Sequence, residues 1–226
     1  MNTPKPLIVF DVNETLVDLE SVTPVFERIF GQKGAMRLWF ANLILYSQSL
    51  TQSGTYVAFT DIGAAVLEML AKVQGITVTE QQKQDLTNAF ASMPPHPEVP
   101  AALAQLRNAG FRLFTLTDNT IEIQMRQLKG GGIADYFERH FSAGDAKTHK
   151  PNARAYGHAE HELDVSPSRL LLIASHTWDT QGALGAGWHA ALIKRPLNDV
   201  LGVGLQPDVI GTDLKDVAEQ LITRYE

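Results

Sequence analysis

Three apolar stretches of the chain each end on polar side chains that could do chemistry. The stretch LIVFDVNETL carries Asp11 directly after four apolar residues, and Thr15 follows four positions later. Two later stretches, FRLFTLTDN and RLLLIASH, end on Thr117, Asp118, Asn119, Ser175 and His176. A carboxylate can act as a nucleophile that forms a covalent ester, which divides one difficult displacement into two easier steps. Asp11 is therefore the first candidate for a catalytic residue.

The elements that must position these side chains read as alternating strands and helices. Short continuous apolar runs are typical of strands that are buried on both faces of a parallel sheet. Such runs lie at residues 7–10, 111–119, 169–176, 189–196 and 208–211. Their alternation with helices predicts an α/β fold with a Rossmann-like, doubly wound parallel sheet. Ligands bind beyond the carboxyl ends of such strands, so we expect the polar residues to meet there.

The segment from residue 17 to residue 97 interrupts this alternation. It contains four stretches that read as helices and no good strand candidate, and PPHPEVP at 94–100 is typical of a hinge. We therefore predict a core domain built from residues 1–16 and 98–226, with an inserted all-helical cap domain at 17–97. A cap that leaves the sheet after the first strand would lie over the predicted site like a lid.

Composition narrows the possible partners and locations. The chain has 226 residues, a formal net charge of −6 and no cysteine. Without a basic cluster to neutralise phosphates, we expect no nucleic-acid partner. Disulfides and thiolate chemistry are excluded. The sequence shows neither a signal-peptide pattern nor an apolar window of roughly 18 residues, so we expect a cytoplasmic protein without a membrane partner. The apolar stretch MRLWFANLILY could form a pocket wall or the surface of a homodimer.

Four motifs in this order resemble the haloacid dehalogenase superfamily, and the resemblance covers nearly the whole chain. They are DVNETL from Asp11, Thr117 at a strand end, Lys150 in KTHKPNARAY, and IASHTWD with its acidic Asp179. Within the superfamily the chain looks most like the L-2-haloacid dehalogenases. Asn13 stands where the phosphatases have a second aspartate, and Lys150, Pro151, Tyr156, Trp178 and Asp179 match the dehalogenase pattern.

The resemblance implies a hydrolase that acts on carbon–halide bonds. Asp11 would displace halide from a small anionic substrate, such as a 2-haloalkanoic acid, and Asp179 would activate or position the water that hydrolyses the ester. Lys150 would keep Asp11 ionised, Thr15 and Thr117 would fix its geometry, and no cofactor would be needed. The implied substrate-binding residues are Val12, Asn13, Phe40, Asp118, Asn119, Tyr156, Ser175 and His176.

The chain also departs from the dehalogenase pattern around the expected substrate pocket. Phe40 stands where that group has a halide-binding arginine, and Glu14 stands where it has glycine. Asp118 replaces an asparagine, and His176 replaces another asparagine in the fourth motif. A histidine there could serve as a base or as a halide donor, because its pKa lies near neutrality. The substrate, halogen and chirality preferences therefore stay open.

Simpler roles and rival functions compete with this interpretation. Thr15, Thr117, Asp118 and Asp179 could cap helices, Tyr156 could be a core aromatic residue, and Lys147 competes with Lys150 for the catalytic role. A magnesium-dependent phosphatase would use Asp11, the Val12 carbonyl and Asp179 around the metal, but Asn13 can neither give nor take the proton that this chemistry requires. A binding module on a decayed hydrolase scaffold is the non-enzymatic alternative.

Overall fold

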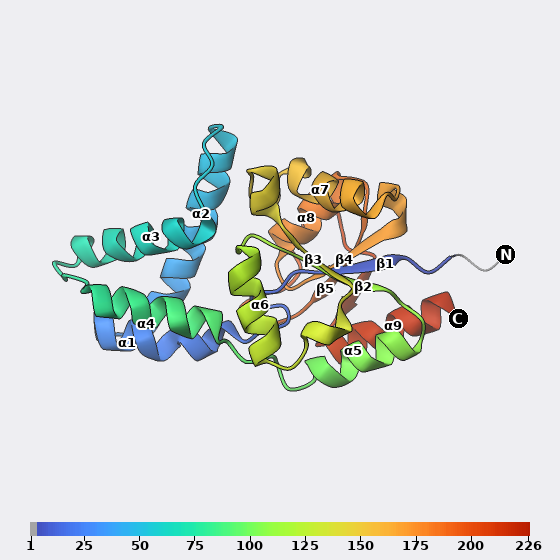
Figure 1. Ribbon diagram of the computed structural model, residues 1–226, viewed down its shortest axis with the longest axis horizontal. Helices are drawn as coiled ribbons and strands as arrows, with labels where there is room; N and C mark the ends of the chain where they lie inside the picture. The colour runs from blue at the N-terminus through green and yellow to red at the C-terminus, as the bar shows by residue number, and fades with distance from the viewer. Residues whose placement is uncertain (1–3) are drawn as a thin grey trace.

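A computed structural model describes residues 4–226 as a parallel sheet flanked by helices, with a helical lobe at one end (Figure 1). Within those residues the sheet has six strands in the order β3-β2-β1-β4-β5-β6, and every pair is parallel. The strands are β1 (Leu7–Phe10), β2 (Leu113–Thr117), β3 (Arg139–Ser142), β4 (Leu170–Ala174), β5 (His189–Ile193) and β6 (Val209–Gly211). The predicted α/β fold with a doubly wound parallel sheet is confirmed.

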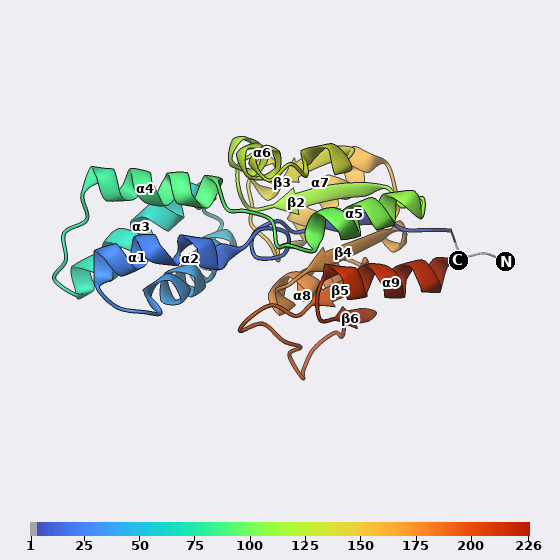
Figure 2. The same ribbon diagram turned by 90° about the horizontal axis from the view of Figure 1, so that it is seen from below.

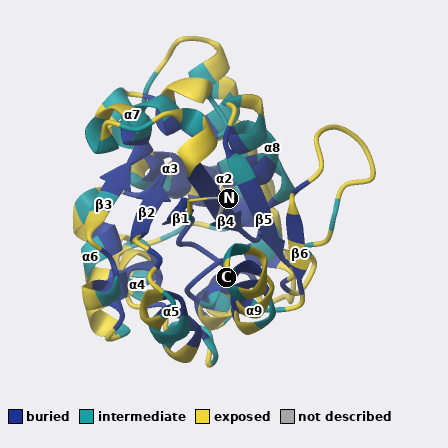
Figure 3. Ribbon diagram, turned by 90° about the vertical axis from the view of Figure 1, so that its right-hand side faces the viewer, coloured by how far each residue is buried: buried dark blue, intermediate teal, exposed yellow. Residues whose placement is uncertain are grey.

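Side chains of the central strand alternate between two apolar cores. Ile8 and Phe10 join the larger core, and Leu7 and Val9 join the smaller one. This alternation is expected because successive side chains of a strand point to opposite faces of the sheet. Figure 3 shows the buried strands between helices whose outer surfaces are exposed.

Helices cover both faces of the sheet. Those on the face of the larger core are α5 (Val99–Asn108), α6 (Ile121–Gly130) and α9 (Leu214–Tyr225). Those on the opposite face are α7 (Ala153–Leu163) and α8 (Thr177–Gly185). Short 3₁₀ turns are η1 (Leu19–Val22), η2 (Ala134–Tyr136), η3 (Ala143–Ala146) and η4 (Pro167–Arg169).

Four helices between β1 and α5 form the lobe beyond the carboxyl ends of the strands (Figures 1 and 2). They are α1 (Thr23–Phe30), α2 (Ala35–Gln52), α3 (Phe59–Val73) and α4 (Glu80–Ala91). Phe26 and Phe90 both pack on Trp39, with ring centroids 5.0 and 5.9 Å away. The lobe therefore has an aromatic centre of its own. None of the helices within residues 4–226 is long and apolar enough to cross a membrane.

The chain enters and leaves the lobe through two segments that lie side by side. Val17 and Pro95 form an isolated antiparallel bridge, and the amide of Asp18 donates to the carbonyl of Pro94 at 2.8 Å. This pairing supports a domain boundary at residues 17 and 97, which stays a prediction.

One of the strands was not predicted from the sequence. The strand β3 reads RHFS, with Arg139 exposed and His140 half-buried. It lies at the edge of the sheet, where short and polar strands are common because an exposed apolar edge would promote aggregation. A search for apolar runs does not find such a strand. The other five strands lie within or at the predicted runs, and Asp118, Asn119, Ser175 and His176 follow strand ends.

Candidate active site

The sheet topology brings three predicted motifs to one place. β1 lies between β2 and β4, so the residues that follow these strands share one edge of the sheet. Asp11 follows β1, Asp118 follows β2 and Ser175 follows β4. Lys150 comes from the loop between η3 and α7, and Asp179 lies in the first turn of α8.

The ammonium of Lys150 bridges two buried carboxylates. Its Nζ atom lies 2.8 Å from Asp11 Oδ1 and 2.6 Å from Asp179 Oδ2, and it also donates to the Leu116 carbonyl at 3.1 Å. Burial alone would raise the pKa of Asp11, but Lys150 and His176 outweigh it and hold that pKa well below its usual range. Asp11 is therefore an ionised carboxylate in a buried site.

Burial has the opposite outcome for Asp179. It raises the pKa of this carboxyl to about 6, although the Lys150 ammonium acts in the other direction. The hydroxyl of Tyr156 donates to Asp179 Oδ1 at 2.7 Å, and the Tyr156 ring is buried against Trp188. Tyr156 is thus a core aromatic residue whose polar end supports Asp179. Its hydroxyl is directed to Asp179.

The second oxygen of Asp11 is held by a threonine. Thr15 Oγ1 donates to Asp11 Oδ2 at 2.6 Å and accepts from the Ser175 amide at 2.9 Å. Thr15 lies in a turn closed by the Leu16 amide and the Val12 carbonyl, and not at a helix start. Thr117 is buried, but its hydroxyl accepts from the Asn119 amide at 3.3 Å. No hydrogen bond joins Thr117 to Asp11 within residues 4–226.

The remaining polar residues of the second motif support the loops around the site. Asp118 Oδ1 accepts from the Lys150 amide at 2.9 Å, which fixes the loop that carries the lysine. Asn119 and Gln127 both donate to Asn13 Oδ1, at 3.0 and 3.2 Å, and Gln127 also donates to the carbonyl of Phe90 in the lobe. Sequence reasoning missed Gln127, which follows no motif. Neither Asp118 nor Asp179 is a helix N-cap, because Thr120 and His176 take those positions.

A second charged cluster lies beside Asp11. Glu14 is buried, and its carboxylate forms an ion pair with Arg37 of α2 and accepts from Asn198 Nδ2 at 3.0 Å. His176 Nε2 lies 2.8 Å from Glu14 Oε2, and its Nδ1 lies 3.6 Å from Asp11 Oδ2. Burial would lower the pKa of His176, but the two carboxylates raise it to about 9. The imidazole is therefore a cation at neutral pH.

Two aromatic rings pack against the imidazole of His176. The ring of Phe40, from α2, lies 5.6 Å from it, and the ring of Trp178 stacks on it at 5.1 Å. Phe40 therefore lies beside His176, where it contacts a cation instead of supplying one, and its role in substrate binding stays a prediction. The guanidinium of Arg37 forms ion pairs with Glu14 and Glu20, so its charge is neutralised by carboxylates of this chain.

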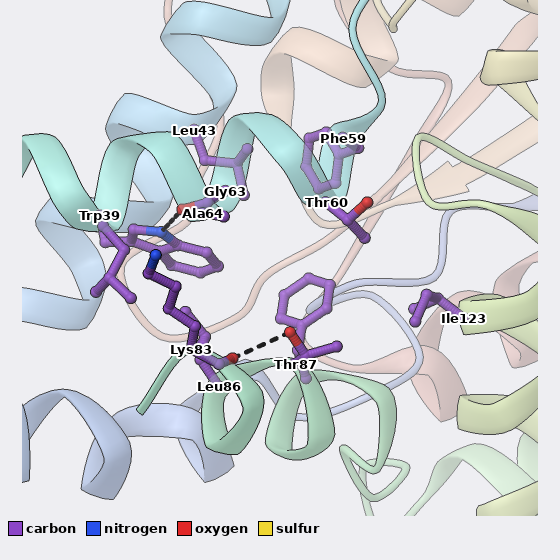
Figure 4. A pocket seen from close by; sticks show the side chains of 12 residues that line it. Trp39, Leu43, Phe59, Thr60, Gly63, Ala64, Lys83, Leu86, Thr87 and Ile123 are labelled. Carbon is purple, nitrogen blue, oxygen red and sulfur yellow. Dashed lines mark hydrogen bonds between the residues drawn. The ribbon is translucent and has the colours of Figure 1, made fainter. Parts of the chain in front are cut away.

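Two hollows lie near these residues. A cavity of about 60 Å³ lies inside the lobe, where Trp39 Nε1 donates to the Gly63 carbonyl at 2.8 Å. Figure 4 shows the side chains that line it. Its lining is mostly apolar and includes Ile123 of α6. A wider cleft of about 610 Å³ separates α2 from the loop around His149 and Pro151. This cleft is lined by His149 and Pro151, the two sequence neighbours of Lys150.

The arrangement does not fit a metal centre. Within residues 4–226 no group of three or more histidine or acidic side chains is placed to hold an ion. The carbonyl of Val12 accepts from the amides of Leu16 and Val17, at 2.9 and 3.2 Å, so it is already engaged. The place between Asp11 and Asp179 is filled by an ammonium. The metal site of the phosphatase alternative is therefore not formed.

Comparison with known proteins identifies the class. Residues 5–187 match the family model of haloacid dehalogenase-like hydrolases, so the chain belongs to that family. It is 27% identical over 216 residues to (S)-2-haloacid dehalogenase 2 of Pseudomonas sp. (strain CBS-3), covering 95% of this chain and 94% of that protein. It is 29% identical over 190 residues to haloacetate dehalogenase H-2 of Moraxella sp. (strain B), covering 83% and 85%.

The fold is also that of a solved dehalogenase. The structure of L-2-haloacid dehalogenase from Xanthobacter autotrophicus with chloropropionic acid covalently bound superposes with a TM-score of 0.89. The two chains are 21% identical, and the match covers 96% of this chain and 98% of that one. At this identity the likeness establishes the shared fold.

Proposed function

We propose that this protein is a hydrolytic dehalogenase that acts on 2-haloalkanoic acids or related small halogenated acids. The observation that carries the proposal is the buried Asp11 carboxylate, which Lys150 keeps ionised and Thr15 orients. An ionised carboxylate with little water around it is suited to displace halide from carbon. The names of the relatives, which are 2-haloacid and haloacetate dehalogenases, support the same class of substrate.

The reaction takes two steps. A carboxylate oxygen of Asp11 attacks the carbon that bears the halogen, the carbon–halogen bond breaks, and halide leaves with the bonding electrons. Water then attacks the carbonyl carbon of the resulting Asp11 ester. The bond between that carbon and the ester oxygen attached to the substrate breaks, and a hydroxy acid is released. Water supplies one oxygen of the restored Asp11, and the overall products are the alcohol, halide and one proton.

The surrounding residues have separable roles. Lys150 lowers the pKa of Asp11. Its ammonium is held by Asp179 and in turn orients the Asp11 carboxylate. The imidazole of His176 lies beside the nucleophile and packs against Phe40, and Ser175 holds Thr15 through its amide. The proposed reaction uses only water, the substrate and side chains of this chain, and it involves no cofactor.

Two further expectations are proposals of the same kind. We propose a homodimer, because α2 exposes apolar side chains of Leu38 and Leu45, 50% and 54% exposed. We also propose a cytoplasmic location, which rests on the sequence alone.

Halide release from a panel of 2-haloacids tests the proposal. The panel includes 2-chloropropionate and fluoroacetate, with EDTA and then with magnesium, and p-nitrophenyl phosphate serves as the rival substrate. We expect halide release that EDTA does not change and that Asp11→Asn abolishes, while Asp135→Asn, at an exposed position, keeps it. Magnesium-dependent phosphate release without halide would replace the dehalogenase with a phosphatase, and no product from either substrate class would favour a binding module.

A further inference from the structure

The imidazole of His176 is placed between the nucleophile and a second carboxylate. Its Nε2 atom lies 2.8 Å from Glu14 Oε2, and its Nδ1 atom lies 3.6 Å from Asp11 Oδ2. Nδ1 is buried and has no hydrogen-bond partner within residues 4–226. One ring nitrogen is therefore anchored, and the other faces the reacting group without an anchor. A base that is oriented by a third group has this arrangement in hydrolases that use covalent intermediates.

Glu14 is held firmly enough to orient the ring. Its carboxylate also contacts Arg37 and accepts from Asn198 Nδ2 at 3.0 Å, and its carbonyl lies 3.0 Å from His96 Nε2. The backbone of Glu14 has a φ of +63°, a left-handed conformation that is unfavourable for residues other than glycine. These contacts keep the side chain in place despite that conformation. Phe40 and Trp178 also pack against the imidazole, which limits its rotation.

Asp179 is less available for proton transfer. Its Oδ2 atom accepts from the Lys150 ammonium, and its Oδ1 atom accepts from the Tyr156 hydroxyl. The pKa of each donor is raised above its usual value. The neighbouring carboxylates raise the pKa of Lys150 against the effect of burial, and burial and Asp179 together raise the pKa of Tyr156. Both oxygens of Asp179 thus face donors that keep their protons. The geometry suits Asp179 to fixing Lys150.

We infer that His176 takes the proton of the hydrolytic water and passes it to the leaving alcohol, with Glu14 as its positioning residue. The inference rests on the proposed dehalogenase function. As water attacks the carbonyl carbon of the Asp11 ester, one water proton moves to His176 Nδ1. When the carbon–oxygen bond to the substrate breaks, the departing alkoxide takes a proton from the same nitrogen. A proton from the remaining carboxylic acid then passes to His176, which restores the ionised Asp11.

The first chemical step removes a negative charge beside His176, and this change favours the neutral imidazole that a base requires. In the free protein the imidazolium faces the carboxylates of Asp11 and Glu14, while Lys150 and Arg37 lie beyond them as the nearest other cations. Ester formation removes the negative charge of Asp11. The pKa of His176 falls because one of the two carboxylates that raise it is neutralised. The proton lost at that point is released with the halide as a product, and in the second step water supplies the proton that restores the imidazolium of His176.

A rapid-quench burst experiment separates the two steps. Protein is mixed with excess 2-chloropropionate and quenched at intervals, and free chloride and the mass of the intact chain are measured. We expect His176→Gln to release about one chloride per chain and then to accumulate an ester on Asp11. Ester hydrolysis should slow at least ~100-fold, which is within the range of general-base catalysis. His161→Gln, at an exposed position on α7, should behave as the wild type.

Glu14→Gln tests the positioning role through the pH dependence. Because the Glu14 carboxylate raises the pKa of His176, its removal should move the acid limb of ester hydrolysis to lower pH. A merely structural loss would lower the rate without moving that limb. In the wild type, the rate of ester hydrolysis should rise with pH as one group loses its proton.

The outcomes distinguish this inference from the function on which it rests. A folded His176→Gln protein that turns over without an ester, or that loses the chloride burst, would overturn the role of His176. A wild-type rate of ester hydrolysis that is flat between pH 5 and 9 would do so without any variant. A wild type that releases no chloride and gains no mass on Asp11 would instead remove the proposed dehalogenase function.

Discussion

The Nζ atom of Lys150 lies 2.8 Å from the Oδ1 atom of Asp11, and both side chains are almost completely buried. The same ammonium reaches Asp179 at 2.6 Å, so one cation serves two carboxylates. Removing one member of a buried ion pair leaves an uncompensated charge, which is more costly than losing an exposed pair. The site therefore depends on Lys150 for stability and for chemistry.

Lys150→Met should impair both properties. We expect the pKa of Asp11 to rise, halide release at pH 7 to fall at least ~100-fold, and the free energy of unfolding to fall by about 3–5 kcal/mol. Halide assays and urea denaturation measure the two effects. Lys147→Met is the matched control, because the Lys147 ammonium lies over the Tyr56 ring, 5.2 Å from its centroid. Equal losses in both variants would contradict the assignment of Lys150.

Gly182 in α8 sets how closely Tyr156 approaches Asp179. A Cβ atom at Gly182 would collide with the Tyr156 hydroxyl and would lie 2.5 Å from Cβ of Pro151. Gly182→Ala should therefore lower the free energy of unfolding by about 1–3 kcal/mol and reduce halide release. Gly185→Ala, in the same helix, has nothing within 4 Å of its new Cβ and should leave both properties near wild type. Similar behaviour of the two variants would show that Tyr156 is not tightly confined.

Local patterns were sufficient to predict the sheet and the carboxylate at its centre. The apolar run before Asp11 and the polar ends of the next runs reflect a buried parallel sheet, where strand interiors are apolar and the ligand edge is polar. The edge strand β3 lacks such a pattern because it begins with two polar residues, Arg139, which is exposed, and His140, which is half-buried.

The partners of the site residues could not be predicted in the same way. Glu14 meets Arg37 only once the lobe has packed on the sheet, and it meets Asn198 only once the loop after β5 has folded beside β1. The choice between Lys147 and Lys150 likewise depends on which ammonium reaches the carboxylates. One feature of the site could be predicted from the family resemblance. The dehalogenase pattern has glycine at position 14, and the backbone of Glu14 adopts the left-handed conformation that glycine accepts readily.

Tyr156→Phe should act through the pKa of Asp179. Burial already raises that pKa to about 6, and loss of the hydroxyl donor should raise it further. An aspartate with a raised folded pKa destabilises the fold as pH rises through that value. We therefore expect the variant to lose about 1–3 kcal/mol at pH 7.5 and less at pH 4.5, as measured by urea denaturation. Tyr46→Phe, on α2, is the control, and a loss that does not depend on pH would exclude Asp179 as the cause.

His176 should make the stability of the protein depend on pH in the alkaline range. Its pKa is raised from 6.5 to about 9, because Asp11 and Glu14 outweigh the effect of burial. A raised histidine pKa contributes stability that is fully present below pH 6.5 and is lost as pH rises through about 9. We expect the wild-type free energy of unfolding to fall by roughly 2–4 kcal/mol between pH 6 and 9.5.

Urea denaturation at the two pH values measures this loss directly. His176→Gln should remove most of the difference, because glutamine has no proton to lose in this range. His161→Gln should keep it, since the side chain of His161 is exposed. Parallel losses in the wild type and in His176→Gln would show that another group titrates and that His176 does not cause the loss.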